Sequence, residues 1–451
     1  MSQTHVINSL QIEIETSAES TAFQLRDALN HYWPQWVTVH MEKALDRLSP
    51  GDATIRIDKL EIDLETLEVE NFDDDFPERI ERLFSDRLQE IIHSKSISHL
   101  NSNNSATDLD LLNSFLNTGT LPWWSQSRQD IDFNHIINIL SQEKPEEMRD
   151  LFLNTFRRRD SLLRLLYQFD IQLISNVSRS LFGMDRHAEE VGKQVEFLQN
   201  NDRLVSESET AKFRFLAYLA HLSKRENINA ESSLQAASER FLPFLKQNEW
   251  EQLSESLMNM KATADAVSRV EHASKYEDKL SEQQTKYVIR HAGVVLVAPF
   301  LPQLFRQLNL LADKGGTFKD EQAAFRAVAL LAYIGRGKSV VPEYELILEK
   351  LLCGISIQQP VPLDSELTLS EMQEADEMLN AVVGHWTVLK SVAGLREGFF
   401  EREGILQDMG STWLLRVERK SYDMLFDHRP PPWGFRVLRF SWNPKVVETE
   451  W

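Results

Sequence analysis

Residues 337–339, Gly-Lys-Ser, are the stretch of this chain that most resembles a ligand-binding motif. In a phosphate-binding loop, glycine amides and a lysine hold phosphate groups at the start of a helix. Such a loop also needs a glycine at position 332, where this chain has alanine, and it follows a strand, whereas residues 321–334 have the apolar spacing of a helix. Pro342 also comes too early for the helix that should follow. The sequence therefore argues against nucleotide binding here.

Other catalytic patterns lack their partner residues. Residues 187–189, His-Ala-Glu, begin a zinc-deaminase pattern, but the paired cysteines of that pattern are absent. The sequence has one cysteine, Cys353, which excludes an internal disulfide and a cysteine-cluster zinc site, and no activating base adjoins it. We interpret Cys353 as a buried apolar residue. We predict that the protein is not an enzyme and has no catalytic, cofactor-binding or metal-binding residues.

The charge balance limits the classes of partner. The 451 residues include 69 acidic and 49 basic side chains, for a net charge of -20. This balance argues against a general nucleic-acid binder, which needs a positive surface to meet phosphate. The first residues, Met-Ser-Gln-Thr-His-Val, lack the basic and apolar segments of a secretory signal, so we expect a cytoplasmic protein.

Two charged clusters could bind ions or partners. Residues 58–86 contain twelve acidic and three basic side chains, including three aspartates at 73–75. They could form a metal or partner patch, but we interpret them as a solvated loop before a helix that starts near Pro77. The three arginines at 157–159 could contact phosphate, but amid so much acid we interpret them as a solvated or salt-bridged turn. We place no metal in either cluster.

The longest apolar run of the chain is residues 291–305, and we predict that it is buried. From Gly293 to Leu301 nine residues have no charged or polar side chain, about half of the roughly 20 that a membrane-spanning helix needs. Pro299 and Pro302 interrupt the run further. We therefore predict a core helix with a proline-forced break and no insertion into a membrane.

The elements that would position these residues follow from hydrophobic spacing. Residues 5–15 and 55–67 alternate as strands do, and residues 17–48 have helical spacing. We therefore predict a β-α-β domain with a trailing helix in residues 1–92, followed by a polar linker in residues 93–108.

The remainder of the chain is mainly helical by pattern. Helical spacing recurs in a middle region, residues 109–283, with a break near Gly183, and in a C-terminal domain, residues 284–410. Ser370 with Gln373 predicts a capping box at the start of one helix. The predicted fold class is mainly α, a helical array with a small β-α-β unit at the N-terminus and a short β segment at the C-terminus.

Residues 411–451 are predicted to be a β-rich, tryptophan-rich tail. Between Arg416 and Lys445 seven basic residues stand against three acidic ones, so this end could dock onto the acidic N-terminal region or onto a partner. Two tryptophans behind Pro122 could form a ligand cage, but we interpret them as a wedge that locks a loop onto helices. Tryptophan and arginine are enriched where binding energy concentrates. The candidate interface residues are Trp123, Trp124, Trp413, Trp433, Trp442, Trp451, Arg416 and Arg419.

Separated sequence blocks also carry a resemblance to a known family. They comprise residues 5–14 and 55–64, 118–124, 291–302, 342–346, 351–354, 385–386, 413–423, 432–434 and 450–451. One of them reads Thr-Gly-Thr-Leu-Pro-Trp-Trp and another Pro-Glu-Tyr-Glu-Leu. In order and content these blocks resemble the tape measure proteins of contractile injection systems, phage-tail-like particles in which a sheath drives a rigid tube into a target.

The resemblance implies a structural role in the tube or at its base, where such a protein sets tube length and helps to start assembly on the spike and baseplate. It implies tube, spike and baseplate proteins as partners and assembly into a contractile particle. The sequence does not give the copy number, although a threefold or sixfold homo-oligomer would suit a tube. As a single helix, 451 residues would span at most about 680 Å, and residues 130–280 about 230 Å. Because the chain is short and interrupted by prolines, we favour a compact initiator or adaptor at the particle base.

Two other functions remain open from the sequence. A soluble assembly chaperone or adaptor would escort tube or spike subunits and be absent from finished particles. An enzymatic cargo delivered by the particle would need a catalytic constellation, which the sequence does not contain.

Overall fold

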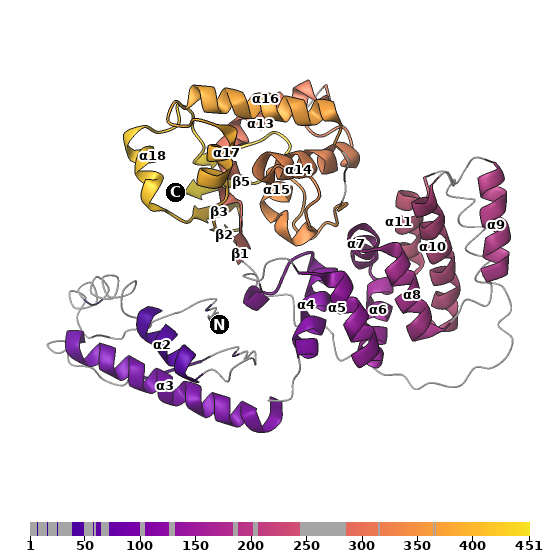
Figure 1. Ribbon diagram of the computed structural model, residues 1–451, viewed down its shortest axis with the longest axis horizontal. Coiled ribbons are helices and arrows are strands. Elements are labelled where there is room, and N and C mark those ends of the chain that lie inside the picture. The colour runs from indigo at the N-terminus through magenta and orange to yellow at the C-terminus, as the bar shows by residue number, and fades with distance from the viewer. Residues whose placement is uncertain are drawn as a thin grey trace. The chain divides into compact units, whose positions relative to one another are not determined.

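The computed structural model describes residues 7, 16, 25, 38–48, 57, 60–64, 72–99, 104–125, 131–183, 188–201, 206–243, 286–313, 316–363, 365 and 367–451. The chain divides into two compact units. One comprises Met1–Asp110 with Trp123–Ser127, and the other comprises Leu111–Pro122 with Arg128–Trp451. The described chain is mainly helical, with a small sheet formed near the C-terminus, as the sequence predicts (Figure 1).

The described residues of the first unit include the helices α2 (Thr38–Leu48) and α3 (Phe72–His99). They pack through a small apolar cluster of Met41, Ala44, Phe84 and Leu88. The predicted β-α-β unit is not shown. Nearly all of residues 5–15 lie outside the described residues, and the described residues 60–64 are neither helix nor strand.

Two predicted loops in this part of the chain are wrong. Helix α3 begins at Phe72, so the three aspartates at 73–75 lie within its first turn, where acidic residues favour the helix amino terminus, and not in a loop before Pro77. Helix α3 continues to His99, and α4 spans Asn104–Thr118, so the polar linker expected at 93–108 is helical at both ends. Serine and asparagine cost a helix less than about 0.7 kcal/mol each relative to alanine, so polarity alone does not stop one.

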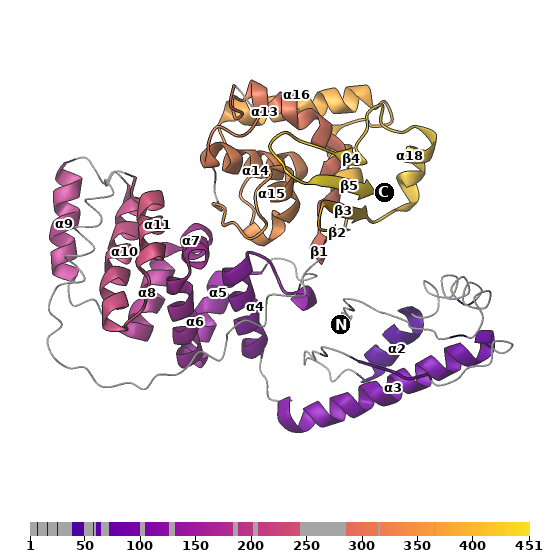
Figure 2. The ribbon, with the colours of Figure 1, turned by 180° about the vertical axis from the view of Figure 1, so that it is seen from behind.

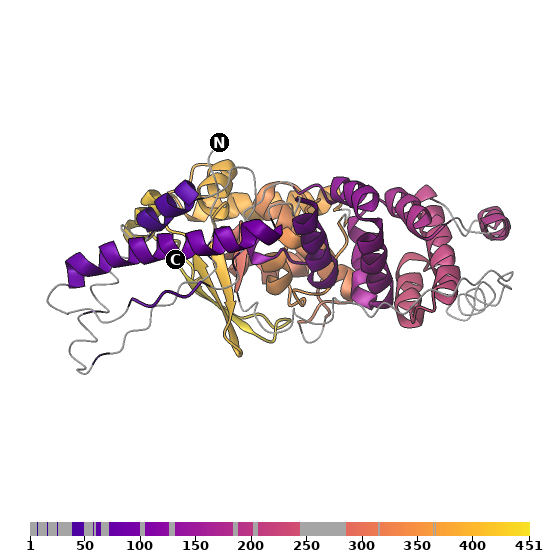
Figure 3. The ribbon, with the colours of Figure 1, turned by 90° about the horizontal axis from the view of Figure 1, so that it is seen from below.

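In the second unit a stack of short helices follows α4. These are α5 (Phe133–Glu143), α6 (Pro145–Arg157), α7 (Arg159–Gln168), α8 (Ile171–Phe182), α9 (Ala188–Asn200), α10 (Glu207–Arg225) and α11 (Glu231–Phe241). They lie side by side, coloured purple to rose in Figure 3. Side-chain caps at Asp132, Asp170 and Ser206 start three of them, and Gly183 ends α8 at the predicted break. The described part of the middle region, up to residue 243, is thus a helical array.

The C-terminal part of the second unit, residues 286–451, mixes short helices with strands. Its helical elements are η4 (Ala292–Phe300), α13 (Leu301–Gln307), α14 (Glu321–Arg336), η5 (Glu343–Glu345), α15 (Ile347–Leu352), α16 (Leu369–His385), α17 (Val392–Leu395), η6 (Arg396–Phe400), η7 (Ser421–Asp423) and α18 (Met424–His428). Its strands are β1 (Lys286–Ile289), β2 (Gly404–Asp408), β3 (Thr412–Val417), β4 (Val437–Leu438) and β5 (Val446–Glu450).

The long apolar run is buried as predicted, but it is a 3₁₀ helix, η4, that becomes α-helical only at Leu301. Its backbone lies against η6. A Cβ atom at Gly293 would sit 1.7 Å from the carbonyl oxygen of Phe399. Among the described residues, the structure contains no helix that is both long enough and apolar enough to cross a lipid bilayer.

The five strands form one mixed sheet in the order β1-β2-β3-β5-β4, which Figure 2 shows from one edge to the other. Strands β3 and β5 pair in parallel, and the other neighbours pair antiparallel. Strands β1 and β2 come from residues 284–410, which we expected to be helical and separate from the tail at 411–451. Instead, both ranges contribute strands to one sheet and side chains to one hydrophobic core.

Candidate functional site

The turn after α4 is built around a glycine in a left-handed conformation. Gly119 has φ +74°, and its amide donates a hydrogen bond to the carbonyl of Phe115 at 2.8 Å. A Cβ atom at this position would lie 2.3 Å from Glu343 Oε1 and 2.9 Å from Arg164 Nη2. Glycine is therefore needed both for the turn and for the close approach of two charged side chains.

Those side chains belong to a fully buried group of charges. The guanidinium of Arg164, on α7, lies 3.0 Å from the carboxylate of Glu343, on η5, and the Lys350 ammonium, on α15, lies 2.6 Å from the same carboxylate. The three side chains are at most 1% exposed. Burial, opposed by the charge of Glu343, lowers the pKa of Lys350. Two cations therefore share one carboxylate away from water, which makes the position of Glu343 critical.

Backbone carbonyls accept further hydrogen bonds from these cations. Arg164 donates to the carbonyl of Leu116 at 2.6 Å and to that of Gln358 at 2.5 Å, and Lys350 donates to the carbonyl of Ile357 at 2.9 Å. Leu116 lies in the last turn of α4, where carbonyls have no partner within the helix. The charges thus join α4, α7, η5 and the loop after α15.

The residue after Glu343 adds an aromatic contact to this connection. Tyr344 meets the rings of Phe115 and Phe133 at centroid distances of 5.8 and 6.0 Å. Gln168 accepts a hydrogen bond from the Glu343 amide at 3.1 Å. We call the group of Arg164, Glu343, Tyr344 and Lys350 the Glu343 joint, because it fastens the helical array to the C-terminal part of the second unit.

A second buried pair fixes the end of the chain. Arg402 and Asp423 lie 2.6 Å apart and are at most 1% exposed. The indole nitrogen of Trp451 donates to Asp423 Oδ2 at 3.0 Å, and the amide of Lys420 donates to the same oxygen at 2.9 Å. The last residue of the chain is thereby held against the core.

A third buried pair is Arg336 with Glu349. Arg336 directly precedes the Gly-Lys-Ser stretch, residues 337–339. Burial, followed by the nearby cations Arg336 and Arg290, lowers the pKa of His291 to about 3, so its imidazole is neutral near pH 7. Burial also raises the pKa of Cys353, which keeps its thiol protonated and unreactive. These groups are therefore poor acids, bases or nucleophiles.

The Gly-Lys-Ser stretch lies at the wrong end of a helix for phosphate. Gly337, with φ +72°, caps the C-terminus of α14, and its amide donates to the carbonyl of Tyr333 at 2.7 Å. A helix C-terminus carries partial negative charge, whereas phosphate binds at amino termini. The structure thus agrees with the prediction against a nucleotide site.

The structure brings four of the predicted interface tryptophans onto one core instead of onto a surface. Trp413 and Trp442 are buried, and Trp433 and Trp451 are half-buried. Trp442 donates to the carbonyl of Leu352 and Trp433 to that of Leu296, each at 2.9 Å. These rings hold the C-terminal residues against η4 and α15.

The other four predicted interface residues are placed differently. Trp124, in the 3₁₀ turn η3 (Trp123–Ser125) of the first unit, is half-buried, and the side chain of Trp123 lies outside the described residues. Arg416 and Arg419 are exposed. Arg416 pairs with Glu450 at 2.7 Å. Arg416 and Arg419 are thus the members of the predicted set that are exposed in the part of the chain that the structure describes.

Sequence reasoning missed the buried charges, although a signal was available. Arg164 stands inside Leu-Leu-Arg-Leu-Leu, residues 162–166, and Lys350 precedes two leucines and a cysteine. A charged residue within an apolar run must be buried with a partner or turned to solvent. Its partner cannot be read from one sequence, because Arg164 and Glu343 are far apart in the chain.

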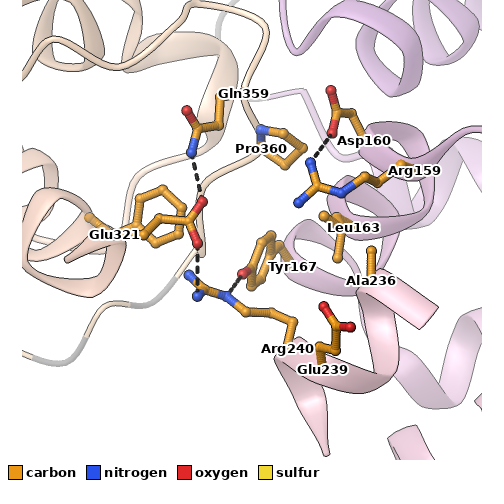
Figure 4. A pocket seen from close by; sticks show the side chains of 11 residues that line it. Arg159, Asp160, Leu163, Tyr167, Ala236, Glu239, Arg240, Glu321, Gln359 and Pro360 are labelled. Atoms are coloured by element: carbon orange, nitrogen blue, oxygen red, sulfur yellow. Dashed lines mark hydrogen bonds and ion pairs between the residues drawn. The ribbon is translucent and has the colours of Figure 1, made fainter. Parts of the chain in front are cut away.

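A pocket of about 180 Å³ lies beside the Glu343 joint, between α7, α11, α14 and residues 359–360 (Figure 4). Arg240 contacts Glu321 at 3.0 Å, and Gln359 donates to Glu321 at 2.8 Å. Arg159 contacts its neighbour Asp160 at 3.3 Å. The lining has charges of both signs, because Arg159, Asp160, Arg240 and Glu321 form pairs and Glu239 adds a further carboxylate, so it does not gather charge of one sign for a ligand. Across the part of the chain that the structure describes, no group of three His, Cys, Asp or Glu side chains could hold a metal ion.

The contacts described above are buried ion pairs, packed aromatic rings and capped helix ends. They hold the helices and strands of the second unit together. A model of the contractile injection system tape measure protein family matches residues 4–451, so the chain belongs to that family. No curated protein and no solved structure matches it.

Proposed function

We propose that this protein is a compact, non-enzymatic assembly protein at the base of the tube of a contractile particle, and not an extended ruler inside the tube. The observation that carries this proposal is the Glu343 joint, which fastens the helical array to the C-terminal part of the second unit through fully buried charges. In this role the chain helps to start tube assembly on the spike and baseplate.

The lengths of the described helices support this proposal. The longest helix wholly within the second unit is α10, with 19 residues among those described, which corresponds to about 28 Å. A ruler of one helix would need continuous helices of hundreds of ångströms. Extending this unit would also separate Arg164 from Glu343, and breaking a buried ion pair costs about 3–5 kcal/mol.

The proposed partners are the tube, spike and baseplate proteins. A threefold or sixfold ring of this chain would match the symmetry of a tube and spike. Arg416 and Arg419, exposed near the C-terminus, are the proposed contacts with them. A chaperone that escorts subunits and then leaves is the alternative function.

Quantitative mass spectrometry of purified particles separates these functions. We expect a fixed number of copies per particle, three or six, together with antibody labelling at one end of the tube. In cells without the protein, tubes should fail to start, and the wild-type chain supplied in trans should restore them. If finished particles contain none of the protein while their formation still requires it, the chaperone function is correct and this proposal is wrong.

A further inference from the structure

The sheet of the second unit has one buried face and one exposed face. Pairing in register places Val288, Ile405, Arg416 and Glu450 opposite one another across β1, β2, β3 and β5. The same pairing places Leu414, Glu448 and Val437 on that side. We call this side the outer face of the sheet, because the residues between them, such as Leu406, Leu415 and Val447, are fully buried on the other side.

The outer face exposes an unusual amount of apolar surface. Val288 is 36% exposed, Ile405 44% and Val437 66%. The face also includes the parallel pair β3–β5, and parallel strands are ordinarily covered on both sides. Both observations favour a partner that covers this face in the assembled state.

The charged side chains of the outer face are compatible with burial under a partner. Arg416 and Glu450, toward one end of their strands, pair with each other at 2.7 Å, so covering them leaves neither without a partner. The face has one further acidic side chain within its described strands, Glu448, which is exposed between Leu414 and Val437. Exposed cations stand at its edges: Lys286 on β1, and Arg436 and Arg439 on either side of β4. In a chain with net charge -20, this rim favours a partner with acidic groups around an apolar centre.

The size of the face limits what can cover it. Five strands at about 4.8 Å spacing and five residues at about 3.3 Å make roughly 20 by 17 Å, or about 340 Å². A stable dimer buries about 800 Å² on each subunit, so a second copy joined by this face alone would be held weakly. A helix about 10 Å in diameter fits across the face.

We propose that the outer face docks an amphipathic helix of another particle subunit, with apolar side chains over Val288 and Ile405 and acidic side chains toward Lys286, Arg436 and Arg439. This inference rests on the proposed assembly function, because it takes the partner from the particle. The contact would orient the C-terminal part of the second unit on the particle base.

The test compares Ile405→Glu and Val288→Glu with Leu369→Glu. Leu369 begins α16, outside the sheet, and is 76% exposed, so it controls for an added charge at an exposed apolar site. Each tagged variant is co-produced with the untagged wild-type chain, so that particles still form. We expect Ile405→Glu and Val288→Glu to reduce the tagged copies per purified particle at least tenfold, and Leu369→Glu to leave them unchanged. Circular dichroism and thermal unfolding should show that all three variants fold.

A second pair of variants tests the rim. Arg436→Glu and Arg439→Glu should reduce the tagged copies per particle most strongly when assembly takes place in low salt, and the reduction should shrink in high salt, because salt screens the attraction between these cations and acidic groups. If Ile405→Glu enters particles as the wild type does, this inference is wrong and the assembly function stands. If light scattering shows a wild-type dimer that Ile405→Glu dissociates, a second copy covers the face and the inference also fails. If wild-type protein is absent from particles, both proposals fail.

Discussion

At the scale of single residues, Glu343 is the charged side chain that we expect to contribute most to the stability of the folded protein. Its carboxylate is the shared partner of Arg164 and Lys350, and all three side chains are buried. Neutralising it would leave two cations without their counterion in a medium that solvates charge poorly. Breaking a buried ion pair by removing one partner costs about 3–5 kcal/mol.

Glu343→Gln should therefore lower the free energy of unfolding by about 3–5 kcal/mol, as measured by urea denaturation. Glu450→Gln is the matched control, because its pair with Arg416 is 60% and 52% exposed, and such pairs contribute less than about 1 kcal/mol. Equal losses for the two variants would show that the Glu343 joint does not hold the unit together.

His291 makes stability depend on pH. Burial and nearby cations lower the pKa of its imidazole from 6.5 to about 3, so the unfolded chain binds a proton in this range that the folded chain does not. Stability is therefore complete above pH 6.5 and declines as pH falls toward 3. At pH 5 the loss relative to neutral pH is about 2 kcal/mol, at 1.36 kcal/mol per pH unit.

His291→Gln should remove this dependence. Urea denaturation at pH 7 and pH 5 should show a loss on acidification that is smaller in the variant by about 2 kcal/mol. An identical loss in both proteins would mean that other groups cause the acid sensitivity.

The roles of residue types were predicted better than their positions in space. Cys353 is a buried apolar residue as expected, and the Gly-Lys-Ser stretch lies outside any phosphate-binding geometry. The tryptophans were expected at an interface, but Trp413 and Trp442 complete the core of their own chain. Aromatic and arginine residues have the same sequence signature in a core contact as in a partner contact, so one sequence does not separate the two.

At the scale of elements, the turn after α4 places the backbone of Gly119 close to the charged side chains of the Glu343 joint. Gly119 and Gly410 both have positive φ, +74° and +82°, but a Cβ atom at Gly119 would strike Glu343 whereas the space beside Gly410 is open. An alanine at either site strains the backbone by about 1–2 kcal/mol. Only at Gly119 does it also displace buried charges.

Gly119→Ala should therefore destabilise the protein by several kcal/mol, and Gly410→Ala by about 1–2 kcal/mol. The shift in thermal midpoint of the two variants measures the difference. If both variants unfold at the same temperature, the close approach at Gly119 adds nothing to the strain of a left-handed backbone.

Element boundaries were predicted less well than element types, for physical reasons. The helix α16 was expected to start with a capping box of Ser370 and Gln373, but Thr368 and Glu371 form that box. Both pairs have the required spacing, and only packing decides between them. Strands β1 and β2 were missed because each is short and is stabilised by its neighbours in the sheet.

At the scale of the whole molecule, the blocks spread over the chain predict the family, and hydrophobic spacing predicts the mainly helical fold. The buried ion pairs could not be predicted in this way, because Arg164 and Arg402 lie outside those blocks and their partners, Glu343 and Asp423, lie in other parts of the chain. Those contacts make the second unit a folded body, and from this we infer that the chain helps to start assembly and does not span the tube.

Tube length in particles that carry a lengthened chain tests this inference most directly. A 28-residue helical insertion within residues 244–283 leaves every described helix intact and would lengthen a helical ruler by about 42 Å. Electron microscopy should show particles of unchanged tube length, with a 28-residue Gly/Ser insertion at the same place as the matched control. A tube that lengthens by about 42 Å with the helical insertion, and in proportion when the insertion is doubled, would contradict the account and make this chain a ruler.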